Sequence, residues 1–211
     1  MRSKDPTLFL LAAATLATLA SVVLTRSAQT ALAYPPAVGI LGEAKNCLAC
    51  HVSNGPWNDD HQTIIDVLDR ETKSSLRQPD GSFLIDVKRG QTRTVLTVLG
   101  RTKADTKEAP YRNAWLYIDP KTIKTASLSK FAPGWDVNLP MSCRVVGDKI
   151  EGYEGASVTV LPMTVRPTDA AQSGELVLQV MLTKGDSVKG NTRAGMVGSY
   201  FERRVQLKVI D

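Results

Sequence analysis

The chain has 211 residues with a formal net charge of +5, and it contains two histidines and three cysteines. The length suits one ordinary domain preceded by a short segment. The charge excess is mild and comes without a basic run interleaved with aromatic residues, which excludes a nucleic-acid interface of the usual kind. No Ser-His-Asp set and no phosphate-binding loop is recognisable, so we predict no catalytic residues.

Residues 1–33 have the layout of a secretory signal. A short charged start, residues 1–5, is followed by an uncharged apolar stretch, residues 6–25. The small residues Ala31-Leu32-Ala33 then form a possible cleavage site. The apolar stretch is also close to the length that spans a bilayer, so an uncleaved N-terminal membrane anchor is the alternative. Both interpretations predict a periplasmic or otherwise extracytoplasmic protein, attached to the membrane in the second case.

Residues 34–61 form a distinct segment that carries the sequence Cys47-Leu48-Ala49-Cys50-His51. This is Cys-x-x-Cys-His, the attachment motif of haem c. Cys47 and Cys50 can each bond one vinyl group of the porphyrin, and His51 then reaches the iron as its proximal ligand. A redox dithiol or half a zinc site would not need the adjoining histidine. Export agrees with the motif, since bacteria attach haem c outside the cytoplasm. We therefore predict one haem c.

The sixth ligand of the iron stays open. His61 lies ten residues after His51, beyond the break at Pro56, and would give a bis-histidine iron. Met141 lies in a proline-containing loop and is the best methionine candidate. The α-amino group of Tyr34 is available only if cleavage follows Ala33.

The remaining methionines are weaker candidates for the sixth ligand. Met163 follows a proline, whereas Met181 and Met196 lie in strand patterns, where we expect core packing. An open, five-coordinate iron is the last alternative. Cys143 is left without an intrachain partner; a buried thiol and an intermolecular bridge are its two interpretations.

Residues 62–211 have the pattern of about eight short strands. Phe83, Ile85 and Val87 alternate with more polar residues, and so do Val205 and Leu207. Turn sequences such as Pro-Asp-Gly separate these runs. The pattern predicts an antiparallel β-sandwich, immunoglobulin-like or fibronectin-like, with the haem segment packed against it.

The order of these parts resembles cytochrome f. Tyr34-Pro35 matches the mature start of that family, Cys47 to His51 match its haem motif, and a β domain follows. The resemblance covers about twenty residues by motif. It implies that the amine of Tyr34 is the distal ligand, as it is in that family.

These features together predict a monohaem c-type cytochrome that relays single electrons. It would act as a carrier or as a subunit of a respiratory or photosynthetic complex, with other redox proteins as partners. No methionine follows His51 before Met141, so the chain differs from small helical cytochromes c. The alternatives are a haem enzyme or gas sensor with an open iron, and an interaction module whose haem is structural.

Overall fold

The computed structural model describes residues 47–49, 51–116, 134–137, 142–186, 191 and 194–211. The chain divides into two compact units, Met1–Tyr34 and Pro35–Asp211, and every described residue belongs to the second. Tyr34, Cys50 and Met141 lie outside the described residues.

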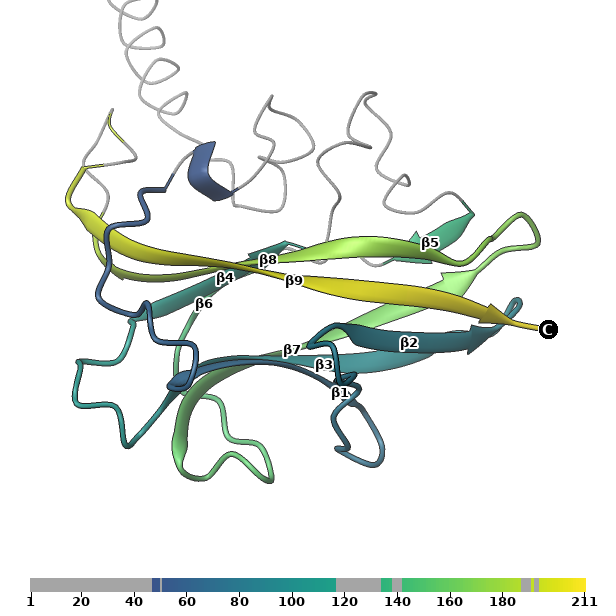
Figure 1. Ribbon diagram of the computed structural model, residues 1–211, viewed down its shortest axis with the longest axis horizontal. Helices are drawn as coiled ribbons and strands as arrows, with labels where there is room; N and C mark the ends of the chain where they lie inside the picture. The colour runs from purple at the N-terminus through teal and green to yellow at the C-terminus, as the bar shows by residue number, and fades with distance from the viewer. Residues whose placement is uncertain (1–46, 50, 117–133, 138–141, 187–190, 192–193) are drawn as a thin grey trace, which may run out of the picture. The chain divides into compact units, whose positions relative to one another are not determined.

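Two β-sheets face each other in this unit (Figure 1). The four-stranded sheet has the order β1 (Thr63–Asp69), β3 (Arg93–Thr102), β7 (Ala156–Pro167), β5 (Trp135–Val137). The five-stranded sheet has the order β2 (Phe83–Lys88), β9 (Met196–Ile210), β8 (Gly174–Gly185), β4 (Arg112–Leu116), β6 (Ser142–Val145). A short 3-10 turn, η1 (Cys47–Ala49), precedes them. The predicted β-sandwich is therefore confirmed.

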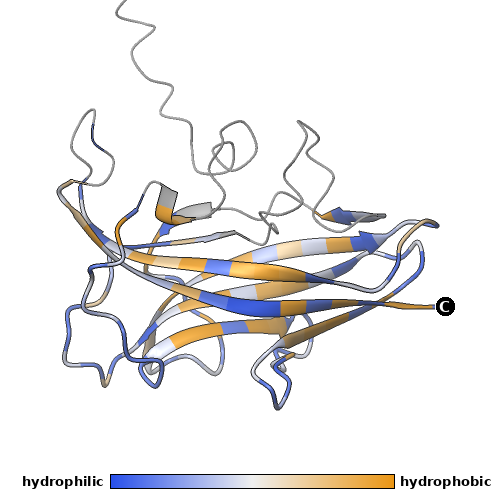
Figure 2. Ribbon diagram, turned by 45° about the horizontal axis from the view of Figure 1, so that its top comes forward, coloured by the Kyte–Doolittle hydropathy of each residue, from blue (hydrophilic) through white to orange (hydrophobic). Residues whose placement is uncertain are grey.

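The alternation in the sequence explains which face of each strand is buried. Phe83, Ile85 and Val87 of β2 point into the core, and so do Val205 and Leu207 of β9. Buried hydrophobic residues of both sheets form one core cluster. Figure 2 shows hydrophobic and hydrophilic residues in alternating bands along the strands. The side chains at successive strand positions point to opposite faces, so this alternation follows from the backbone geometry alone.

Three tryptophans anchor the core: Trp57, Trp115 and Trp135 are each at most 1% exposed. Trp57 comes from the predicted haem segment rather than from a strand. Because a buried aromatic side chain removes about 150–250 Å² from water, Trp57 fastens its segment to the sandwich strongly.

One strand pair departs from the predicted antiparallel arrangement. β2 and β9 run parallel, with Phe83 opposite Val205 and Lys88 opposite Ile210. The reason is that β2 follows β1 of the other sheet instead of forming a hairpin with its neighbour, so nothing forces it to run against β9. No helix in the described residues is long and apolar enough to cross a membrane.

Candidate functional site

The described residues of the predicted haem motif are η1 (Cys47–Ala49) and His51. The backbone N–H of His51 donates to the carbonyl oxygen of Cys47 at 2.9 Å. Residues four apart on such a turn lie on the same side of it. The structure therefore brings Cys47 and His51 together, as the motif requires.

This turn lies directly on β8. The backbone N–H of Cys47 donates to Oε1 of Gln179 at 3.2 Å, and the Cys47 thiol approaches the same oxygen at 3.8 Å. Gln179 is only 1% exposed. A buried amide oxygen thus holds the first cysteine of the motif in place from 132 positions along the chain.

The face of β8 beneath the turn is the one that points away from the core. Leu178, Val180 and Leu182 belong to the core between the sheets, so Gln179 and Met181 point to the other side. Across the strand pair, Glu202 lies opposite Gln179 and Tyr200 lies opposite Met181.

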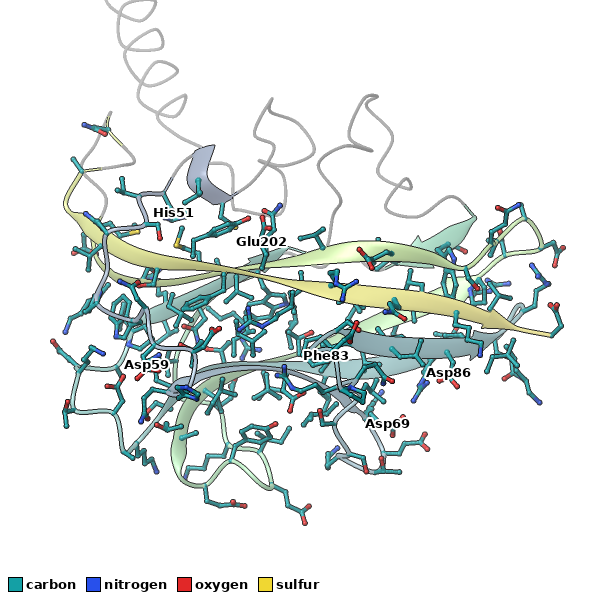
Figure 3. All side chains as sticks on the ribbon, in the orientation of Figure 1. His51, Asp59, Asp69, Phe83, Asp86 and Glu202 are labelled. Atoms are coloured by element: carbon teal, nitrogen blue, oxygen red, sulfur yellow. The ribbon has the colours of Figure 1, made fainter. Side chains whose placement is uncertain are left out.

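We call these four residues the outer cluster: Gln179, Met181, Tyr200 and Glu202. Figure 3 shows His51 and Glu202 on this outer side of β8 and β9, whereas Phe83 lies between the sheets. The motif turn packs on the outer cluster through the contacts between Cys47 and Gln179.

Burial favours the neutral forms of His51 and Tyr200. Burial lowers the pKa of His51, which favours the uncharged imidazole, the form that binds metal. Burial also raises the pKa of Tyr200, and the hydrogen bond and negative charge of Glu202 raise it further. The phenol of Tyr200 consequently stays protonated and donates to Oε1 of Glu202.

The chain that follows His51 runs along the edge of β9. Gly55 N–H donates to the Gly198 carbonyl at 2.6 Å, and Trp57 N–H donates to Oγ of Ser199 at 3.1 Å. Ser53 Oγ accepts from the Tyr200 N–H at 3.2 Å. β2 occupies the same edge of β9 further along, so the segment and β2 share this edge.

Two glycines make this close approach possible. A Cβ at Gly55 would lie 2.7 Å from the backbone carbon of Gly198. A Cβ at Gly198 would lie 2.9 Å from the sulfur of Met181 and 3.0 Å from the carbonyl oxygen of Val52. Residues 51–58 therefore wrap closely around the β9 edge, from the outer face at His51 to the core at Trp57.

The structure separates His61 from this site. His61 lies in the exposed turn before β1, which belongs to the four-stranded sheet, and its N–H donates to Oδ1 of Asp59 at 2.9 Å. Met163 is fully buried in the main core, and Met196 begins β9 half-buried.

The outer cluster was missed by sequence reasoning. The register of β8 carries a usable indication, because Met181 falls out of phase with the leucines and Val180 that form the apolar face. Which segment covers the other face depends on contacts more than 130 residues apart, and local patterns do not reveal them.

The donor set of this site suits haem c. A thiol and a neutral imidazole lie on one turn, and the second thiol, Cys50, falls between them in the sequence.

Among the described residues, no group of three or more His, Cys, Asp or Glu side chains is arranged to hold a metal ion.

Comparison with known proteins gives no relative by sequence: no protein-family model and no curated protein matches the chain. Among solved structures, the fold is similar to the ASH/PapD-like domain of human CEP192 (PapD-like domain 7). The two share 9% identity with a TM-score of 0.32, over 74% of this chain and 92% of that one.

Proposed function

We propose that this protein is an exported monohaem c-type cytochrome that relays single electrons between redox proteins. It serves as a carrier or as a subunit of a respiratory or photosynthetic complex. The observation that supports the proposal best is the motif turn: Cys47 and His51 share one hydrogen-bonded turn that rests on a buried strand face.

The attachment chemistry needs only the two thiols of the motif. Cys47 and Cys50 would hold the porphyrin through thioether bonds, because addition of each S–H across a vinyl double bond would form one S–C bond and pass the hydrogen to the other vinyl carbon. No oxidant is consumed. When bound, haem supplies an iron that takes up and releases one electron.

The other residues of the site position and shield this group. The neutral imidazole of His51 provides the proximal nitrogen. Gln179 fixes the backbone of Cys47, and the hydrogen bonds between residues 53–57 and β9 keep the turn from moving. A rigid setting of this kind suits electron transfer, because it limits rearrangement when the charge on the iron changes.

An electron carrier also needs partner proteins. A reduced one-electron donor protein supplies the electron and an oxidised acceptor protein removes it. A haem held by so short a segment on a sheet face would keep part of its edge outward, which would suit a small or transient docking interface. It does not suit substrate chemistry, which needs an enclosed pocket with placed polar groups.

Haem staining after denaturing electrophoresis tests the proposal. The protein is produced in a bacterium that attaches haem c, beside a Cys47→Ala, Cys50→Ala double variant. Cys143→Ala is the matched control, because this third cysteine lies outside the motif. We expect stain in the wild type and in Cys143→Ala, and none in the double variant. A wild-type band without covalent haem would overturn the proposal.

A further inference from the structure

We propose that the thioether sulfur of Met181 is the sixth ligand of the haem iron, an inference that rests on the proposed function. The sequence pattern points to core packing for this residue. The structure confirms that Met181 is buried, but places it on the outer face of β8 and outside both hydrophobic clusters of the described residues.

Met181 is completely buried, yet it faces away from the main core. Its neighbours on β8, Val180 and Leu182, belong to the core cluster between the sheets. Met181 itself is in neither hydrophobic cluster of the described residues, although its exposed fraction is 0%. It lies on the outer face, where the motif turn rests.

The neighbours of Met181 on β8 and β9 contact the motif turn and the residues that follow it. Gln179, two positions earlier on the same face, accepts the hydrogen bond from the backbone of Cys47. Tyr200 lies directly opposite Met181 on β9, and its backbone N–H donates to Oγ of Ser53, two residues after His51. A Cβ added at Gly198 would lie 2.9 Å from the Met181 sulfur and 3.0 Å from the carbonyl oxygen of Val52, the residue after His51, so both atoms lie over Gly198.

The spacing along β8 agrees with ligation. Two residues of a strand advance about 7 Å. Met181 therefore lies about that far along β8 from Gln179, the residue that binds the backbone of Cys47. Cys47 would hold a vinyl group of the porphyrin near Gln179, and Met181 would offer a thioether to the iron from the same face of β8.

The glycine at position 198 supports the same assignment. A Cβ there would lie 2.9 Å from the Met181 sulfur, so the absence of a side chain keeps space for this sulfur. Thioether sulfur is an established ligand of haem iron and raises its reduction potential relative to a second histidine. The exposed His61, at the start of the other sheet, has no comparable position.

The test compares Met181→Leu with Met163→Leu in the haem-loaded protein. Leucine has about the volume of methionine and cannot bind iron, so packing is largely kept. Met163 is also fully buried but lies in the main core, which makes its variant the matched control. Haem staining is measured in parallel, because attachment depends on Cys47 and Cys50 and not on Met181.

We expect the oxidised wild type to show the weak long-wavelength charge-transfer band of methionine-ligated haem. Met181→Leu loses this band, becomes high-spin and binds carbon monoxide rapidly when reduced, with haem staining unchanged. Met163→Leu keeps the wild-type spectrum. A Met181→Leu spectrum identical to the wild type, or a wild type without the band, overturns the assignment while the covalent haem still supports the proposed function.

A second measurement does not depend on the folding of a variant. The reduced wild-type protein should give a methionine methyl proton resonance shifted far upfield by the porphyrin ring current. If covalently loaded, reduced protein lacks this resonance, the methionine assignment is wrong. If no covalent haem is present at all, the proposed function itself fails.

Discussion

Arg101 is a charged residue in the interior, with 1% of its side chain exposed. Its Nη2 lies 2.6 Å from Oδ2 of Asp105, and its Nη1 donates to the carbonyl of Asp59 at 2.8 Å. The guanidinium therefore ties the end of the haem segment to β3. Removing one partner of such a pair leaves a buried charge uncompensated.

Arg101→Ala should lower the free energy of unfolding by about 3–5 kcal/mol. Arg204→Ala is the matched control, because Arg204 is 53% exposed and pairs with Asp80 at the surface. An exposed pair of this kind contributes about 1 kcal/mol or less. Urea unfolding of the two variants measures the difference, and equal effects would show that the Arg101 pair does not stabilise the fold.

Asp69 predicts an acid dependence of stability. The N–H of Thr72 donates to its carboxylate, Arg93 lies beside it, and together they lower its pKa from 3.8 to about 2 despite partial burial. A carboxylate with a lowered folded-state pKa stabilises the fold above pH 4, and this contribution is lost as the pH falls toward 2. Because solvent screens the partly exposed pair, we expect the contribution to be about 1 kcal/mol.

Asp69→Asn should therefore lower the free energy of unfolding at pH 7 by about 1 kcal/mol and have almost no effect near pH 2. Chemical unfolding at a series of pH values measures this. A deficit of the same size at both ends of the range would contradict the assigned cause.

At the level of elements, the haem segment depends on its contact with β9. Gly55→Ala should place a Cβ against the Gly198 backbone, where the available distance is 2.7 Å. We expect residues 51–58 to detach from the edge of β9. The backbone amides at positions 55 and 57 should then exchange with solvent at least tenfold faster than in the wild type. Core strands such as β8 should keep their protection.

Gly155→Ala is the control for this exchange experiment. No atom lies within 4 Å of a Cβ added at Gly155, so its replacement should leave exchange unchanged throughout. Equal protection in Gly55→Ala and the wild type would mean that the segment does not depend on this close approach.

The strands were predictable because each carries a period-two pattern, as β2 and β9 show with Phe83 and Val205. The motif turn was predictable because Cys47 and His51 are close in sequence. The outer cluster was not predictable from the sequence. It depends on a contact between the segment around Gly55 and β9, which lie some 140 residues apart in the chain. Burial on the second face of β8 is a tertiary property, and a single strand does not encode it locally.

At the scale of the whole molecule, the proposed function requires that the chain is exported before haem is attached. Cleavage after Ala33 predicts that the mature protein begins at Tyr34, with a mass equal to that chain plus one haem. Intact-protein mass of the soluble and membrane fractions measures this. Ala33→Gln is the control, because a larger polar residue at the cleavage site should keep the chain full-length.

A full-length wild-type mass in the membrane fraction would instead show that residues 1–33 remain as an anchor. The nitrogen of Tyr34 would then be a peptide amide and could not bind the iron.

A coulometric titration monitored by visible absorption tests the central claim most directly. It counts the electrons that each chain takes up and identifies the group that takes them. The account predicts one electron per chain, with the absorption change of a c-type haem, and loss of both in the Cys47→Ala, Cys50→Ala variant. Uptake of two electrons per chain without visible absorption would identify Cys47 and Cys50 as a redox dithiol and contradict the account.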